Sequence, residues 1–289
     1  MKIERIDVAH CMVGEGPLWD VAEQALYFID IVGKAVHRYH PASGDTRRWD
    51  VGQIIGSMAL REQGGAIVAL KDGISTLDLE SGAIDLLAPA RHLHPRAQMN
   101  DGKVDRRGRF VVGSGDSDIR DCRPYGSLYR LGPDHELREL DREIAISNGP
   151  CWSPDDKTFY FSDSLPHHIY AYDYDIDTGA VANKRLFADT RELGGIPDGA
   201  TVDRDGLMWV AICEGAKIVA YRPDGQIERV IDMPVKLPAS VMFGGAALDE
   251  LYVTSIDPTL VGREPDGGGA TFVITGLGAR GIAEARYAG

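Results

Sequence analysis

Short hydrophobic runs recur along the chain at nearly regular intervals. Six of them are rich in Val, Ile, Phe, Tyr and Trp, and turn-forming clusters such as DRRG (105–108), SPDDK (153–157) and DRDG (203–206) precede several. We therefore expect each run to be a β-strand. The runs are ALYFID (25–30), GAIVAL (65–70), GRFVVG (108–113), TFYFSD (158–163), LMWVAI (207–212) and ELYVTS (250–255).

Further strands are expected after each of these runs. A second hydrophobic run follows in every case: AVHRYHP, GISTLDL, GSLYRLGP, IYAYDY, KIVAYRP and ATFVIT. In five cases a more polar run comes next: TRRWDV, AIDLLA, ELRELD, KRLFAD and QIERVI. No segment keeps apolar residues at helical spacing for the length of a core helix, so the pattern predicts an all-β protein.

A similar opening stands eight to ten residues before each of the six strong strands. The openings are GEGPLW, GSMALR, MNDGKV, SNGPCW, PDGATV and ASVMFG, in which Glu15, Ser57, Asn100, Asn148, Asp198 and Ser240 occupy equivalent positions. These register residues are 42, 43, 48, 50 and 42 residues apart. Such a period, with four antiparallel strands per unit, predicts a six-bladed β-propeller formed by residues 1–289 as one domain. We expect residues 2–8 to close the last blade as its outer strand.

The register residues should converge on the propeller axis, because the first strand of each blade is the innermost. Glu15, Asn148 and Asp198, with Asn100 beside them, would supply oxygen ligands, which suit hard divalent cations such as Ca²⁺, Mg²⁺ or Mn²⁺. The alternative is that these short polar residues only cap turns between loop and strand. Their shared register favours a metal site in the central channel, while Ser57 and Ser240 only line it.

The same motifs, in this order over essentially the whole chain, resemble the senescence-marker-protein, gluconolactonase and luciferin-regenerating-enzyme family. The resemblance implies a six-bladed propeller that holds one divalent metal through the EGP glutamate, the NGP asparagine and the PDG aspartate. Here these are Glu15, Asn148 and Asp198. It also implies that Asn100 contacts the substrate beside the metal. Its neighbour Asp101 is expected to support the site.

Two positions depart from the family pattern. Several members carry an arginine two residues before the NDG asparagine, where this chain has Gln98, with Arg96 two residues further back. Gln98 offers neutral hydrogen bonds instead of a guanidinium fork. The family also uses an acidic residue from the third blade, for which Asp116 and Asp118 are candidates. We assign substrate binding to Asn100, Gln98 and Asp118.

Composition and charge limit the kinds of partner that the protein is expected to bind. The formal net charge of −13 argues against nucleic acid, which requires clustered Lys and Arg. No apolar stretch of about 18 residues occurs and the start of the sequence lacks a signal peptide, so neither a membrane nor secretion is expected, and we predict a cytoplasmic location. The four cysteines have no metal or redox spacing and are expected to be reduced, mostly packed thiols. The sequence leaves the oligomeric state open.

The resemblance implies a divalent-metal-dependent lactone hydrolase. The resemblance implies a gluconolactonase-like reaction on a sugar lactone, and the metal stays open among Ca, Zn, Mg, Mn and Fe. Asp198 is the expected general base. No serine-hydrolase, zincin or P-loop motif competes with this interpretation. The alternatives are a hydrolase of non-sugar lactones or other esters, and a non-catalytic calcium-binding or interaction propeller.

Overall fold

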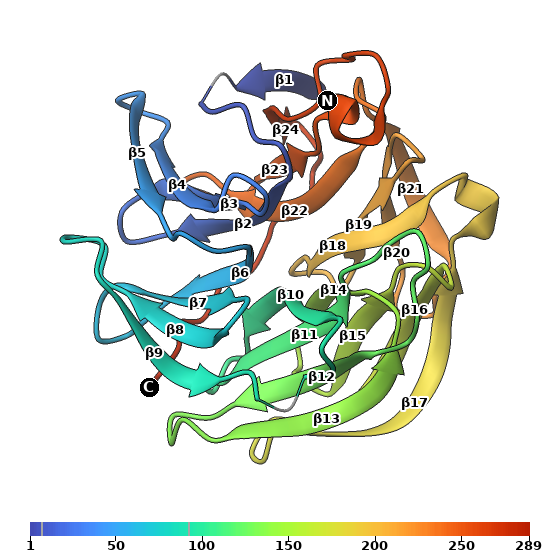
Figure 1. Cartoon of the computed structure of the whole chain (residues 1–289). Coiled ribbons are helices and arrows are strands. Elements are labelled where there is room, and N and C mark those ends of the chain that lie inside the picture. Colours follow the sequence, from blue (N-terminus) through green and yellow to red (C-terminus); the bar gives the residue numbers. More distant parts are fainter. Residues whose placement is uncertain (7, 92) are drawn as a thin grey trace.

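The computed structural model describes residues 1–6, 8–91 and 93–289. Its strands form six four-stranded sheets arranged around one axis (Figure 1). From the axis outward, the first three sheets contain β2 (Gly14–Asp20), β3 (Ala25–Asp30), β4 (Ala35–His40) and β5 (Asp45–Asp50); β6 (Ile55–Leu60), β7 (Ala66–Leu70), β8 (Gly73–Leu77) and β9 (Ile84–Pro89); and β10 (Ala97–Val104), β11 (Phe110–Asp116), β12 (Gly126–Leu131) and β13 (Leu137–Ile144). The others contain β14 (Ser147–Trp152), β15 (Thr158–Asp163), β16 (His168–Asp175) and β17 (Ala180–Asp189); β18 (Ile196–Val202), β19 (Met208–Cys213), β20 (Lys217–Tyr221) and β21 (Ile227–Asp232); and β22 (Pro238–Gly244), β23 (Glu250–Ser255), β24 (Thr271–Thr275) and β1 (Lys2–Ile6).

The prediction of an all-β propeller with six antiparallel four-stranded blades is confirmed. Three of the six strong runs, at 25–30, 158–163 and 250–255, match their strands residue for residue. The largest difference is in the polar outer strands. β13 and β17 are longer than predicted because an exposed strand is stabilised by backbone pairing, which leaves little trace in a hydrophobic pattern.

The sixth sheet joins distant parts of the chain. β1 pairs antiparallel with β24, from Lys2 opposite Thr275 to Ile6 opposite Thr271. The strand expected over 2–8 includes residue 7, which lies outside the described residues. Because β1 occupies the outer position of the sixth sheet, all six sheets have four strands and no strand is missing where the ring closes.

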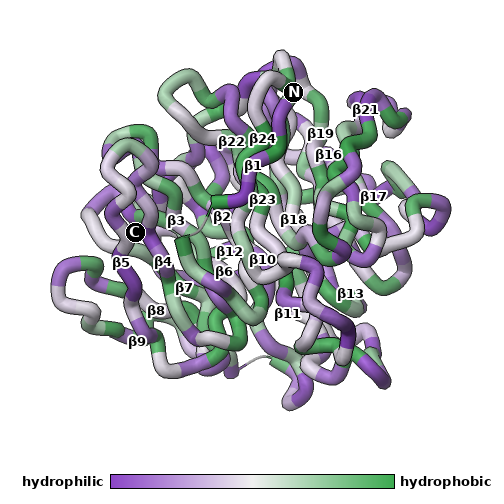
Figure 2. Tube along the Cα trace, turned by 90° about the horizontal axis from the view of Figure 1, so that it is seen from above, coloured by the Kyte–Doolittle hydropathy of each residue, from purple (hydrophilic) through white to green (hydrophobic). Residues whose placement is uncertain are grey.

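Burial decreases from the axis outward. Every residue of β6, β14 and β22 is buried, whereas most residues of the outer strands β5 and β21 are exposed. Figure 2 shows the same gradient, with green hydrophobic stretches along interior strands such as β7 and β23 and purple positions in the turns and along β5. The predicted free cysteines are confirmed, and Cys11, Cys151 and Cys213 are buried. The helices in the described part of the chain are two short 3₁₀ turns, Arg191–Leu193 and Pro258–Val261, neither of which is long or apolar enough to cross a membrane.

The inner strands pack against one another in a closed ring, in which each contacts its two neighbours. At several contacts only glycine fits. A Cβ atom on Gly56 would lie 2.4 Å from the Met99 carbonyl oxygen, and one on Gly199 would lie 1.9 Å from Ser240 Oγ. We call the end of the ring where the inner strands begin the upper face, and the opposite end the lower face.

The contact at Gly56 generates a test of the fold. Gly56→Ala should lower the free energy of unfolding by about 2–3 kcal/mol, because the obstructing atoms are backbone atoms of β10. Gly44→Ala is the control. Its φ of +76° costs about 1–2 kcal/mol, but no atom within 4 Å would meet the new Cβ. Urea unfolding of both variants measures the difference, and equal losses would contradict the close packing.

Candidate metal centre

An irregular β-bulge occurs at the register position of every inner strand. The pairing shifts between Glu15 and Leu18 in β2, between Asn148 and Cys151 in β14, and between Pro197 and Ala200 in β18. The other three inner strands show the same interruption near Ser57, Asn100 and Ser240. A bulge frees backbone from the ladder and re-aims a side chain. Repetition of this bulge explains how residues that are distant in sequence turn toward one axis at the same level.

Glycines make two of these bulges possible. Gly16 and Gly149, which follow Glu15 and Asn148, have φ angles of +50° and +59°. Residues with a Cβ rarely adopt this left-handed conformation. The EGP and NGP motifs therefore have a local structural meaning, since they place an oxygen-bearing side chain directly before a residue that can turn the strand.

Glu15 and Asp198 form a buried carboxyl pair at the axis. Each side chain belongs to a residue that is only 6% exposed, and the two carboxyl groups lie close enough to share a proton. Glu15 also accepts a hydrogen bond from the Gly16 N–H at 2.7 Å. Burial, followed by the nearby charge of Asp101, raises the pKa of Asp198 to about 8. Burial and the charges of Asp198 and Asp101 likewise raise the pKa of Glu15. Without a cation, the pair is therefore held together by a shared proton.

Two amides continue the ring. Asn100 Nδ2 donates to Asn148 Oδ1 at 2.9 Å and to the Ser147 carbonyl oxygen at 2.8 Å. Asn148 Nδ2 in turn donates to Ser164 Oγ, whose hydroxyl donates to the carbonyl of Pro197, next to Asp198. Both protons of the Asn100 amide are thus used, and its carbonyl oxygen remains available as an acceptor.

Asp101 lies directly below this ring and joins two blades. Its carboxylate accepts hydrogen bonds from the N–H groups of Gly102 and Gly149, both at 2.8 Å. The bond to Gly149 fixes the bulge that carries Asn148. Burial raises the pKa of Asp101, against the opposing charge of Lys103. Asp101 therefore has the contacts that a supporting residue requires.

The donor set fits a divalent cation. Two carboxylates and an amide oxygen, from Glu15, Asp198 and Asn148, converge in a place where burial makes an uncompensated charge costly. A cation bound there would replace the proton that the carboxyl pair shares. Among the described residues, no group of three or more His, Cys, Asp or Glu side chains is placed to hold a metal ion, so the candidate centre depends on the Asn148 amide as its third ligand.

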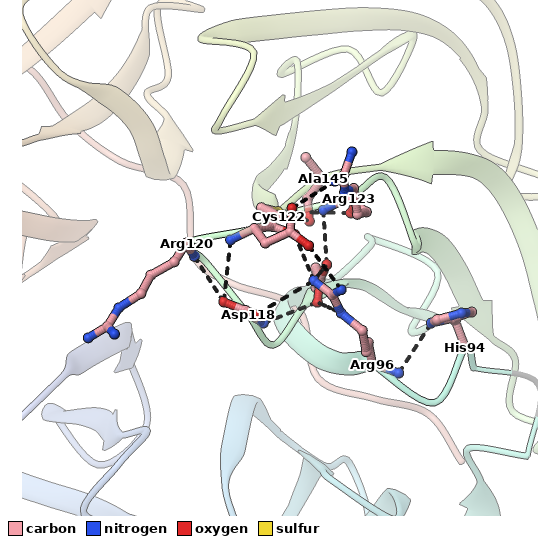
Figure 3. A network of polar contacts seen from close by, with 9 residues as sticks. His94, Arg96, Asp118, Arg120, Cys122, Arg123 and Ala145 are labelled. Carbon is pink, nitrogen blue, oxygen red and sulfur yellow. Dashed lines mark hydrogen bonds and ion pairs between the residues drawn. The ribbon is translucent and has the colours of Figure 1, made fainter.

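The third blade forms one side of the upper face. Arg96 makes two hydrogen bonds to the fully buried carboxylate of Asp116, at 2.6 and 3.1 Å, and also donates to the Asp121 carbonyl (Figure 3). Asp118 accepts hydrogen bonds from the N–H groups of Arg120 and Asp121 and lies 3.9 Å from Arg96. Arg96 is consequently committed to holding the segment between β11 and β12.

Two polar side chains near this segment have no partner among the described residues. Gln98 is half-buried on β10, opposite Gly115 of β11, and its amide makes no hydrogen bond there. The Arg120 guanidinium is also unpaired, and Figure 3 shows its side chain extended away from the Arg96 cluster, on the side opposite His94. The substrate-binding roles of Asn100, Gln98 and Asp118 stay predictions. Arg120, which the sequence motifs did not indicate, is a further candidate for substrate binding.

Comparison with known proteins shows which family this chain resembles. A family model of the SMP-30/Gluconolactonase/LRE-like region matches residues 13–257. Regucalcin from Xenopus laevis is 37% identical, covering 100% of this chain and 99% of its own length. Among solved structures, a luciferin-regenerating enzyme has a TM-score of 0.92 at 30% identity, with 99% of both chains covered. A calcium-binding protein, regucalcin, from Agrobacterium tumefaciens has a TM-score of 0.89 at 25% identity, covering 98% of this chain and 96% of its own.

The carboxyl pair predicts an unusual pH dependence for the metal-free protein. Since the pKa of Asp198 is about 8 in the folded chain and about 4 when unfolded, the folded chain binds the extra proton between these values. Stability should therefore fall as the pH rises from about 4 to about 8. Urea unfolding in the presence of a chelator measures the slope, which should be smaller for Asp198→Asn. Identical slopes in the two proteins would contradict the shared proton.

Proposed function

Because the chain belongs to the SMP-30/gluconolactonase/LRE-like family, we propose that it is a divalent-metal-dependent hydrolase that opens a sugar lactone to the free acid. The observation that carries the proposal is the buried set of oxygen donors, Glu15, Asn148 and Asp198, at the upper end of the axis. A protein-binding propeller would have no need for carboxyl groups buried against one another, because their mutual repulsion and desolvation destabilise the fold.

Lactone hydrolysis needs an activated water, a proton acceptor and stabilisation of the carbonyl oxygen. A divalent cation held by Glu15, Asn148 and Asp198 would polarise the lactone carbonyl and lower the pKa of an adjacent water. Calcium is the first candidate, since one relative of known structure is a calcium-binding protein; Zn, Mg, Mn and Fe are the alternatives.

Asp198 is the general base of this proposal. It takes a proton from the attacking water while the water oxygen bonds to the lactone carbonyl carbon. When the ring C–O bond breaks, Asp198 returns the proton to the departing oxygen, which becomes the hydroxyl of the product acid.

The neighbouring amides orient the substrate. The Asn100 carbonyl oxygen is free to accept a hydrogen bond from a sugar hydroxyl, since both of its amide protons are engaged. The Gln98 amide, without a partner among the described residues, can donate to another hydroxyl. These side chains are neutral. They therefore favour an uncharged aldonolactone over a lactone whose anionic group would need an arginine at the position of Gln98. A smaller, non-sugar lactone is the alternative for the same site.

Replacement of Asp198 tests the base. Asp198→Asn should lower kcat for lactone hydrolysis by about 10³-fold, because proton transfer is lost while the shape of the side chain is kept. Acid release from a panel of aldonolactones and simple γ-lactones is measured at constant pH. Asp205→Asn, an exposed position in a lower-face turn of the same blade, is the control and should keep full activity. If Asp198→Asn keeps most of its activity, another group is the base.

Removal of the metal tests the cofactor. Treatment with a chelator should abolish hydrolysis, and added Ca²⁺ or another divalent cation should restore it, because the carboxyl pair alone cannot stabilise negative charge on the carbonyl oxygen. The rates are compared for each cation on the same lactone panel. Activity that survives chelation would disprove metal dependence. Uncatalysed rates with every lactone and cation would favour the non-catalytic calcium-binding propeller.

A further inference from the structure

The chain crosses the lower face of the ring after its last strand. We call residues 280–289 the floor segment. Its backbone hydrogen-bonds to turns of the sixth, fifth, second and third blades in succession: Gly281 N to Leu248 O, Arg204 N to Arg280 O, Tyr287 N to Leu60 O, and Ala288 N to Gly108 O, at 2.7–3.0 Å. In Figure 1 the segment is the red trace that passes behind the ring to the C label. It therefore spans the channel from one side to the other.

Side chains anchor the end of this segment. Tyr287 is completely buried, and its hydroxyl donates to the Gly132 carbonyl at 2.8 Å. Arg286 donates to both carboxylate oxygens of Asp20, at 2.8 Å each. These contacts attach one end of the segment to the third and first blades, and the backbone hydrogen bonds of Arg280 and Gly281 hold its other end.

The middle of the floor segment, residues 282–285, fills the channel below the candidate metal centre. Two cavities of about 20 Å³ each lie beside it. Together they are lined by inner-strand residues of all six blades, which places residues 282–285 on the axis. Each cavity has room for about one water molecule. The candidate centre is thus closed from below.

A charged pair lies at this closure. Lys103, two residues beyond Asp101 on β10, donates from Nζ to the Ala200 carbonyl at 2.9 Å, and Glu284 Oε1 lies 3.6 Å from the same Nζ. The side chains are only 14% and 15% exposed. One of the two cavities is lined by Asp101, Lys103 and Glu284 together. The three charges are therefore neighbours along the axis, with little water to screen them.

We propose that the floor segment is part of the metal centre, and that Lys103 and Glu284 are positioning residues whose opposite charges set its affinity for a divalent cation. The proposal rests on the proposed function, which places the cation at Glu15, Asn148 and Asp198. In a channel filled with protein, a charge acts over a longer distance than it does in water. The Lys103 ammonium opposes cation binding from below, and the Glu284 carboxylate offsets it.

Opposite charges predict opposite effects, which a purely structural role would not produce. Glu284→Gln should weaken binding of Ca²⁺ by about tenfold, and Lys103→Met should strengthen it by about tenfold, as expected for one charge at short range in a poorly screened site. The double variant removes both charges and should bind Ca²⁺ about as well as the wild type, as in a double-mutant cycle. Titration calorimetry with Ca²⁺ alone measures the three affinities without any substrate.

A matched control separates local from general charge effects. Glu228→Gln removes one carboxylate from an ion pair with Arg222 at the outer edge of the fifth blade, and should leave the affinity unchanged. If Lys103→Met does not fold, Lys103→Gln carries the same test. Equal weakening by both single variants, or no change beyond that of Glu228→Gln, would overturn the inference. A wild type that binds no divalent cation would instead overturn the proposed function.

Discussion

The structure depends on how closely six inner strands approach one axis. Four glycines stand where neighbouring strands meet: Gly56 faces Met99, Gly102 faces Ser57, Gly149 faces the Asp198 carbonyl and Gly199 faces Ser240. A side chain at any of them would separate two blades. The same closeness leaves no room for bulk solvent between the register residues. Backbone packing therefore creates the buried position of these side chains, and the acidic groups give that position its chemistry.

Most of the architecture could be predicted because it repeats. Short hydrophobic strands at a period of about 45 residues predict the blades, and the register residues predict which positions face the axis. The floor segment has neither signal. It is held by backbone hydrogen bonds and by single anchors such as Tyr287, and no periodic pattern marks it. Lys103 and Glu284 are far apart in sequence, so their contact could not be predicted from the sequence. Asp116 was a candidate for the acidic residue of the third blade, but its ion pair with Arg96 could be recognised only in three dimensions.

The electrostatics of the axis differ from those of the surface. Most ion pairs lie on exposed strands and turns, where a pair contributes about 0–1 kcal/mol. Glu15, Asp101 and Asp198 are buried close together, and their like charges repel one another. This repulsion destabilises the metal-free protein. Bulges repeated at one level of all six strands hold them in place. An arrangement that is unfavourable without a ligand and rigidly maintained is a property of binding sites.

The pairing of β1 with β24 also determines when the protein can finish folding. Lys2 meets Thr275, so the sixth sheet stays incomplete until nearly the whole chain has been synthesised. During translation, the earlier blades can form from local hairpins, while β1 waits as an unpaired strand and the last blade presents an open edge. Closure of the ring is then a late step with a large loop-closure entropy. The interval before closure is when this protein is most exposed to aggregation and to chaperones.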